Sequence, residues 1–360
     1  MVVKEHRAVF IWLLMVAASI FAMALIGAIT RLTESGLSIV VWEPVGGAIP
    51  PLNEEDWLRE FALYQTSPQY QLVNKGMSLE EFKDIYFWEW VHRQWGRMIG
   101  VLYALPFFYF LLKNKIPSAY KPHLWGLLVL GGAQGAMGWF MVQSGLVDDP
   151  AVSHYRLAAH LSLAFLLFAL CLRMALIFYV RATHEAAMLA PLRPLLTVVT
   201  VSFCATFVYG AFVAGLDAGL IYNEFPLMGQ NIYPAEIFHM SPWMVNFVEN
   251  HAAVQFIHRI LAFVTLTLAF MLWWKSRYFH MQAGMRLIFL ALPLAVVAQI
   301  CLGVATLLTH VDVAIATIHQ GGALVILAVI VLLWHHTQCP KIIQSPWMRG
   351  KEALGQNDVG

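Results

Sequence analysis

Eight long apolar runs limit the folds that are open to this 360-residue chain. Each run has about 20 residues or more, the length that an α-helix needs to cross the hydrocarbon core of a bilayer. The sequence is 60% hydrophobic and 12% charged, whereas a soluble domain is about a quarter charged. We therefore predict an all-α membrane protein with eight transmembrane helices, at residues 9–29, 87–112, 123–143, 155–179, 194–215, 251–274, 285–308 and 313–336.

The connections between these runs divide by charge. The connections 144–154, 216–250 and 309–312 contain no Lys or Arg, and their charged residues are acidic. Because short basic connections mark the cytoplasmic side of a membrane protein, we expect the N- and C-termini in the cytoplasm. No cleavable signal or transit peptide is apparent, which favours a bacterial inner membrane. The basic residues of the other side are Lys4, Arg7, Lys113, Lys115, Lys121, Arg181, Arg193, Lys275, Arg277, Arg286, Lys341, Arg349 and Lys351.

The first outer loop, residues 30–86, is long and mixed in charge. Two of its segments, "LNEEDWLREFALYQ" and "MSLEEFKDIYFWEW", are typical of short surface helices. Asn53 is the expected N-cap of the first, and Ser78 with Glu81 matches a capping box for the second. We predict that this loop folds into a cap over the outer face.

The chain also repeats itself. "EWVHRQWGRMIG" is similar to "QFIHRILAF", and "LVLGGAQGAMGWF" is similar to "LAVVAQICLGVAT". The offsets are 166 residues for His92 and His258, 165 for Gln134 and Gln299, and 159 for His160 and His319. A repeat with an even number of helices keeps both halves in one orientation. We predict two tandem pseudo-symmetric four-helix bundles, over residues 1–180 and 181–340, and a tail over 341–360.

One histidine lies near the outer start of every second predicted helix: His92, His160, His258 and His319. They lie 5, 5, 7 and 6 residues into those runs, or about 8–10 Å at 1.5 Å per residue. A single membrane histidine is as often an interhelical hydrogen-bonding residue. Four at one depth, paired by a repeat, predict two bis-histidine haem sites with these residues as iron ligands. Neighbouring glycines would give a macrocycle room or serve ordinary helix packing: Gly131, Gly132, Gly135, Gly138, Gly303, Gly321 and Gly322.

The two halves differ beside the first histidine. Glu89 precedes His92 by three residues, whereas the matching position in the second half is Gln255. The first outer loop is also longer, since Gly36 to His92 spans 56 positions and Gly219 to His258 spans 39. We infer that the first bundle binds a porphyrin that is chemically changed. Glu89 would transfer protons or stabilise positive charge beside the ring, or else it is an ion-pair partner of a nearby arginine.

Three arginines follow the helix-starting histidines of the two halves: Arg93, Arg97 and Arg259. Guanidinium groups bind carboxylates bidentately, so these residues suit haem propionates. The alternative is that they anchor their helices at the membrane interface.

The blocks "RLTESGLSIVVWEPVGGAIPPLNEEDW", "NKGMSLEEFKDIYFWEWVHRQWGRMIG", "QFIHRILA" and "IHQGGALV" resemble haem A synthases of the proteobacterial and mitochondrial branch. The resemblance implies eight membrane helices and oxidation of a methyl group of haem O to the formyl group of haem A. It implies that His258 and His319 bind a permanent haem b, and that His92 and His160 belong to the substrate haem site. It ties Glu89 to catalysis.

The resemblance has further implications. Another branch carries a cysteine pair in outer loops, but the four cysteines here lie outside such loops, so no thiol relay is expected. Expected partners are haem O, a haem O synthase, cytochrome oxidase assembly factors and an external electron acceptor. A homo-oligomer stays open, and nucleic acid is not expected. The rival interpretations are a diheme quinol-linked electron-transfer cytochrome and a non-catalytic haem carrier or assembly factor.

Overall fold

A computed structural model describes residues 6–41, 46–145, 152–179 and 185–338. Within these ranges, eight helices are long and apolar enough to cross a membrane, and each coincides with a predicted run. The eight-helix prediction is therefore confirmed. The helices are α1 (Arg7–Leu32), α4 (Leu79–Leu112), α5 (Lys121–Gly145), α6 (His154–Tyr179), α8 (Arg193–Gly215), α10 (His251–Ser276), α11 (Ala283–Leu308) and α12 (Val313–Thr337).

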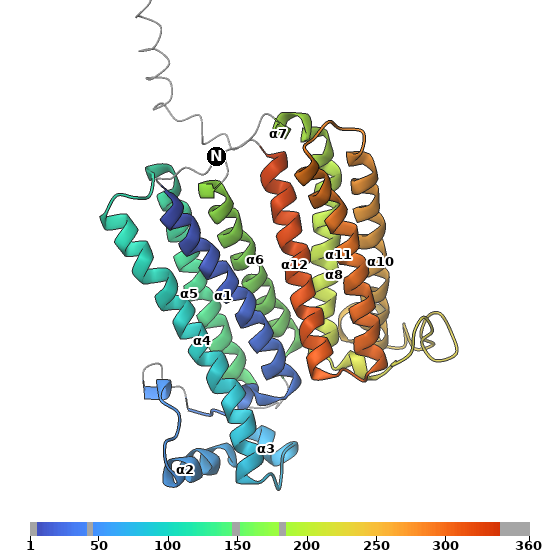
Figure 1. The fold of residues 1–360 in the computed structure, drawn as a ribbon. Coiled ribbons are helices and arrows are strands. Elements are labelled where there is room, and N and C mark those ends of the chain that lie inside the picture. Colours follow the sequence, from blue (N-terminus) through green and yellow to red (C-terminus); the bar gives the residue numbers. More distant parts are fainter. Residues whose placement is uncertain (1–5, 42–45, 146–151, 180–184, 339–360) are drawn as a thin grey trace, which may run out of the picture.

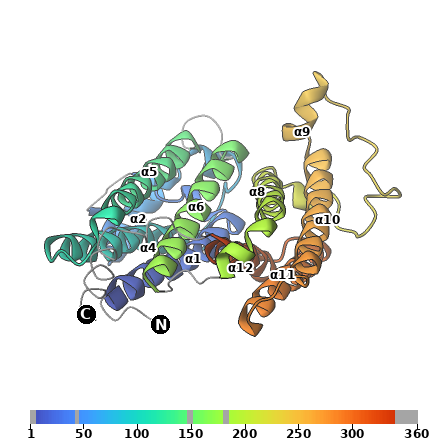
Figure 2. The same cartoon turned by 90° about the horizontal axis from the view of Figure 1, so that it is seen from above.

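The membrane helices pack as two rings of four. In the first ring α1 contacts α4 and α6, and α5 contacts the same two helices. In the second ring α8 contacts α10 and α12, and α11 contacts the same two helices. The rings lie side by side, with α12 against α1 and α6 (Figures 1 and 2). Internal symmetry and the boundary at residue 180 stay predictions, and the predicted tail over 341–360 lies outside the described residues.

One buried apolar cluster runs through both rings. It includes Leu13 and Phe107 of the first ring, and Leu196 and Phe289 of the second, all almost fully buried. Because lipid tails are as apolar as these side chains, close van der Waals packing holds the cluster together. The shared cluster joins the two rings into a single body.

The first outer loop folds against the outer end of α4 (Figure 1). Its short helices are η2 (Ser35–Leu37), η3 (Gly46–Ala48), α2 (Glu54–Tyr64) and α3 (Pro68–Leu72). Ile39, Tyr64, Phe82 and Tyr86 form its small apolar core. The predicted caps are confirmed: the Asn53 side chain accepts a hydrogen bond from the amide of Asp56, and a capping box starts α4.

The second predicted surface helix is wrong as a separate element. Residues from Leu79 onward are the first turns of α4, which continues unbroken to Leu112. No Gly or Pro occurs between Ser78 and Gly96, so nothing in the sequence stops the helix where the polar residues give way to the apolar run. The membrane boundary and the helix boundary are different places in this element.

Short helices complete the other connections. On the outer side they are η6 (Ala218–Leu220), η7 (Trp243–Val245) and α9 (Asn246–Glu249). On the opposite side they are η4 (Ser118–Tyr120), α7 (Glu185–Met188) and η5 (Ala190–Leu192). Side chains of Asn250 and Asp312 cap α10 and α12. The outer turns after α1 and α8 match, because Glu34 and Asp217 both have φ near +50°.

Candidate functional site

The four predicted histidines lie on α4, α6, α10 and α12. His160, His258 and His319 follow the first residue of their helices by 6, 7 and 6 positions, and His92 follows Leu79 by 13 because α4 extends outward. His92 and His160 belong to the first ring, and their imidazoles are close enough to interact electrostatically. The same holds for His258 and His319 in the second ring. The structure thus brings together the two pairs that the repeat predicted.

The imidazoles differ in their hydrogen bonds. Nδ1 of His258 donates to the carbonyl oxygen of Thr206, 2.9 Å away, which leaves Nε2 as the ligating nitrogen. The side-chain nitrogen of Gln134 lies 3.3 Å from Nδ1 and 3.2 Å from Nε2 of His160. Nδ1 of His92 and of His319 is buried and has no hydrogen-bond partner in the described structure.

These imidazole pairs fit haem iron. In His258 the hydrogen bond from Nδ1 fixes the tautomer that presents Nε2 to an iron ion. Neutral imidazole is the usual axial ligand of low-spin haem, and two suffice for one iron. Groups of three or more His, Cys, Asp or Glu that would hold a bare metal ion do not occur among the described residues.

Glu89 is 3% exposed and has four hydrogen-bond donors around it. Its Oε1 accepts from Nε of Arg93 at 3.0 Å and from Nη2 at 2.5 Å. Its Oε2 accepts from the Ser38 hydroxyl at 2.7 Å and from the Ile39 amide at 2.8 Å. The ion-pair alternative for Glu89 is therefore present in the structure, with Arg93 as the partner.

Gln255 makes the same kind of connection in the second ring. Its Oε1 accepts a hydrogen bond of 2.8 Å from Arg259, four residues later. Its Nε2 donates to the carbonyl oxygens of Ala218, at 2.7 Å, and Tyr222, at 3.3 Å. In both rings this side chain ties a histidine-bearing helix to the turn that follows the preceding membrane helix. The difference is one of charge, because a carboxylate in the first ring is an amide in the second.

All three predicted arginines bind carbonyl oxygens of outer loops. Arg93 donates to Ile39 at 2.9 Å, and Arg97 donates to Gly47 at 3.2 Å. Arg259 donates to Leu227 and to Glu224, both at 3.1 Å. These bonds attach the loops to α4 and α10. A role with haem propionates stays a prediction for each arginine.

Sequence reasoning assigned no role to Ser38, Thr206 or Gln134. The signal for Gln134 was available, because a Gln recurs at the matching position 299 in an otherwise apolar helix. Gln299 behaves differently, since its amide donates to the carbonyl oxygen of His319 at 2.7 Å and not to the ring. Thr206 acts through its backbone, which no side-chain pattern reveals.

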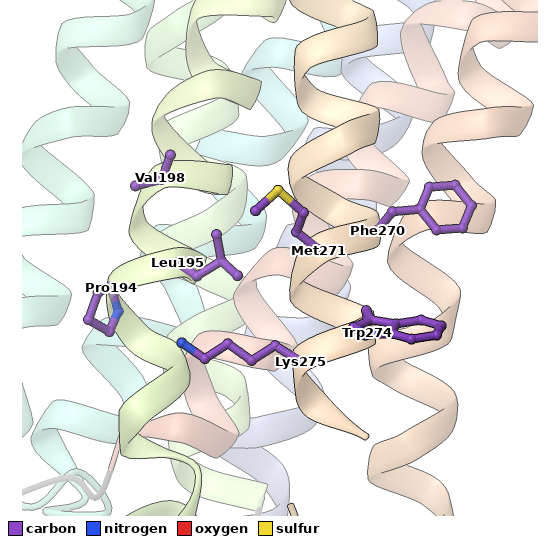
Figure 3. Close-up of a pocket in the computed structure, with 7 residues that line it drawn as sticks. All are labelled: Pro194, Leu195, Val198, Phe270, Met271, Trp274 and Lys275. Atoms are coloured by element: carbon purple, nitrogen blue, oxygen red, sulfur yellow. The ribbon is translucent and has the colours of Figure 1, made fainter. Parts of the chain in front are cut away.

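Two surface grooves are present, and neither is lined by any of the four histidines. The first, of about 740 Å³, lies between α8 and α10 and is lined by residues such as Leu195, Val198, Phe270 and Lys275 (Figure 3). Lys275 belongs to the last turn of α10, at the end opposite His258, so this groove is separate from the histidine pairs. The second, of about 450 Å³, lies beside Arg97 on α4.

Known proteins share this sequence over most of its length. The family model COX15-CtaA, described as cytochrome oxidase assembly protein, matches residues 10–331. A heme A synthase of Rhodospirillum centenum is 50% identical over 335 residues, which cover 93% of this chain and 90% of that protein. A heme A synthase of Parvibaculum lavamentivorans is 46% identical over 92% of this chain and 94% of that protein. A heme A synthase of Nitrosospira multiformis is 44% identical over 89% of this chain and 91% of that protein. With residues 10–331 matched and eight membrane helices in place, the chain belongs to the COX15-CtaA family of cytochrome oxidase assembly proteins.

Proposed function

We propose that this membrane protein is a haem A synthase, which oxidises a methyl group of haem O to the formyl group of haem A for cytochrome oxidase. The observation that carries the proposal is the difference between two otherwise matched sites. Each ring has a histidine pair, but only the first has a buried carboxylate, Glu89, where the second has the amide of Gln255. The names of the relatives support the same activity.

His258 and His319 would hold a permanent haem b as its axial ligands. The bond from His258 to Thr206 supports this assignment, because a carbonyl partner on Nδ1 orients a ligating imidazole and raises its basicity. When bound, haem b supplies one-electron redox chemistry. His92 and His160 would hold the substrate haem O, and the product haem A, in the first ring.

The reaction proceeds by successive hydroxylation, from methyl to alcohol and then to a gem-diol that loses water. With water as the oxygen source, conversion of methyl to formyl releases four electrons and four protons, which an external acceptor and the solvent take up. Glu89 is held by four donors. Such a carboxylate is a fixed negative charge, which favours stabilisation of a developing cation over proton abstraction.

We further propose that the chain spans a bacterial inner membrane with both termini in the cytoplasm. The start of α1 and the end of α12 lie at the same end of the rings, and the basic connections are at that end too (Figure 1). A haem O synthase would supply the substrate, and oxidase assembly factors would receive the product.

The deciding experiment is to express the protein with and without a supply of haem O, extract the bound porphyrins and identify them by mass. We expect one haem b per chain in both cases, together with haem O or haem A only when haem O is supplied. Two haem b per chain, with no haem A, would identify a diheme electron-transfer cytochrome instead.

The variant Glu89→Gln distinguishes an enzyme from a haem carrier. This variant keeps the shape of the side chain, and the second ring shows that a Gln–Arg pair is compatible with the same connection. We expect the purified variant to bind haem O but to form little haem A. Wild-type yields of haem A from the variant would show that the carboxylate has no part in the chemistry.

A further inference from the structure

Each of the four histidine rings lies against a glycine of the preceding membrane helix. A methyl group placed on Gly27 of α1 would lie 3.1 Å from Cε1 of His92, and one on Gly138 of α5 would lie 3.2 Å from Cε1 of His160. In the second ring, the distance is 3.0 Å from Gly210 of α8 to His258, and 2.9 Å from Gly303 of α11 to His319. The same ring carbon, Cε1, is the closest atom in all four cases.

Among the glycines that the structure describes, close contact with an imidazole ring is confined to these four. Gly126 on α5 and Gly284 on α11 have no atom within 4 Å of such a methyl group. Gly131, Gly132 and Gly135 of α5 also face open space. Other glycines also pack closely, Gly215 on His154, Gly321 on Leu25 and Gly322 on Gln299, but their nearest neighbours are not imidazole ring atoms. The four contacting glycines are related in pairs by the repeat, with offsets of 183 residues from Gly27 to Gly210 and 165 from Gly138 to Gly303.

The distances leave no room for a side chain. Non-bonded carbon atoms are most favourable at about 3.5–4.0 Å, so any Cβ at these positions would force the imidazole to turn or the helix to move. With glycine, the helix backbone itself lies against the imidazole. This contact restricts the rotation of a histidine whose Nε2 must point at the iron.

The restriction matters most where hydrogen bonds are missing. Nδ1 of His258 is held by Thr206, and the backbone of Gln299 also interacts with the His319 ring, whereas Nδ1 of His92 has no hydrogen-bond partner in the described structure. For His92 the glycine contact takes the place of the orienting hydrogen bond that ligating histidines usually have.

We propose that Gly27, Gly138, Gly210 and Gly303 are positioning residues that set the orientation of the four haem-ligating imidazoles. The proposal rests on the haem sites of the proposed function, and it adds residues that touch the ligands and not the haem. The first, third, fifth and seventh membrane helices (α1, α5, α8 and α11) each supply a glycine, and the membrane helix that follows supplies the histidine that contacts it.

The test uses Gly303→Ala, because that contact is the tightest of the four. The purified full-length variant is compared with Gly284→Ala, a matched glycine substitution on the same helix. We expect Gly303→Ala to change the g values of the low-spin haem b signal and to shift its midpoint potential, while Gly284→Ala keeps both. Unchanged g values and potential in Gly303→Ala would overturn the proposal.

If Gly303→Ala does not accumulate in the membrane, the proposal is tested with a less disruptive substitution at Gly138. At Gly138 the ring needs to give by only a few tenths of an ångström. Gly138→Ala is therefore expected to fold, with Gly126→Ala as its control on the same helix. We expect the spectrum of added haem O to change in Gly138→Ala alone, and an unaltered spectrum would overturn the proposal. A wild-type protein that binds no haem would instead refute the proposed function.

Discussion

Arg31 donates a hydrogen bond of 2.9 Å to the carboxylate of Asp217, and this ion pair joins the outer end of α1 to the turn after α8. The same guanidinium nitrogen donates to the carbonyl oxygen of Ala214 at 3.0 Å. The pair therefore bridges the two rings. The Asp217 side chain is 62% exposed, and exposed ion pairs contribute about 0–1 kcal/mol.

We predict that Asp217→Asn lowers the free energy of unfolding by less than about 1 kcal/mol. Asn tolerates the left-handed backbone of this position, so the measured loss reports the charge alone. Thermal unfolding in detergent, with the haem content held constant, checks this. A loss of several kcal/mol would mean that the two rings depend on this pair for their association.

Removal of the Glu89 side chain is expected to lower the stability of the protein far more than neutralisation of its charge. Glu89→Ala removes the carboxylate from beside Arg93, whose side chain is only 12% exposed, and breaking a buried pair costs about 3–5 kcal/mol. Glu89→Gln keeps an oxygen as acceptor for Arg93, and its NH2 group can donate to the hydroxyl oxygen of Ser38, while the Ile39 amide loses its acceptor. We predict a clearly lower unfolding temperature for the Ala variant than for the Gln variant. Equal unfolding temperatures would contradict the role of Glu89 as the link between α4 and the cap.

The reverse exchange in the second ring should be tolerated poorly. The amide of Gln255 donates to two carbonyl oxygens, of Ala218 and Tyr222. A carboxylate cannot donate, so Gln255→Glu places it against both oxygens and costs about 1–3 kcal/mol. We expect a lower unfolding temperature and weaker retention of haem b, measured by absorption after gel filtration. If Gln255→Glu is as stable as the wild type, these two hydrogen bonds contribute nothing.

A pH-dependent contribution to stability comes from the outer loop before α10. Tyr222 donates a hydrogen bond to Glu236, which is the largest cause lowering the pKa of Glu236 and raising that of Tyr222 to about 12. The lowered pKa gives stability that is present above the usual Glu value of 4.5 and is lost as the pH falls through the folded value. The raised pKa gives stability that is present below 10.0 and is lost as the pH rises towards 12.

The difference in unfolding temperature between the wild type and Tyr222→Phe should therefore be constant between about pH 5 and 9 and shrink outside that range. Tyr233→Phe, in the same loop, is the control and should show no such dependence. A difference that grows in acid would contradict the assignment.

The eight membrane helices were predictable because the length of an apolar run is a property of consecutive residues, as in residues 9–29 and α1. The caps at Asn53 and Ser78 were predictable for the same reason, since the residues that bond are three apart. The unbroken course of α4 from this cap into the membrane was not, because polar residues such as Glu80 and Lys83 are good helix formers and a hydropathy pattern marks the bilayer, not the helix.

Some features of the candidate site were likewise predictable from the sequence, and others were not. Spacing and the repeat placed the four histidines in two pairs, as the structure has them. The carbonyl partners of Arg97 and Arg259 were out of reach, because loop backbones approach these helices through tertiary folding that leaves no residue pattern. The contact of Gly303 with His319 depends on how two neighbouring helices are rotated about their axes, which the period of an apolar run does not define.

The unbroken course of α4 has a mechanical consequence. Phe82 lies in the core of the cap and His92 lies in the first ring, yet both belong to one rigid rod that starts at Leu79. Because no Gly or Pro interrupts this helix between Leu79 and His92, a tilt of the cap would move the imidazole of His92 against Gly27.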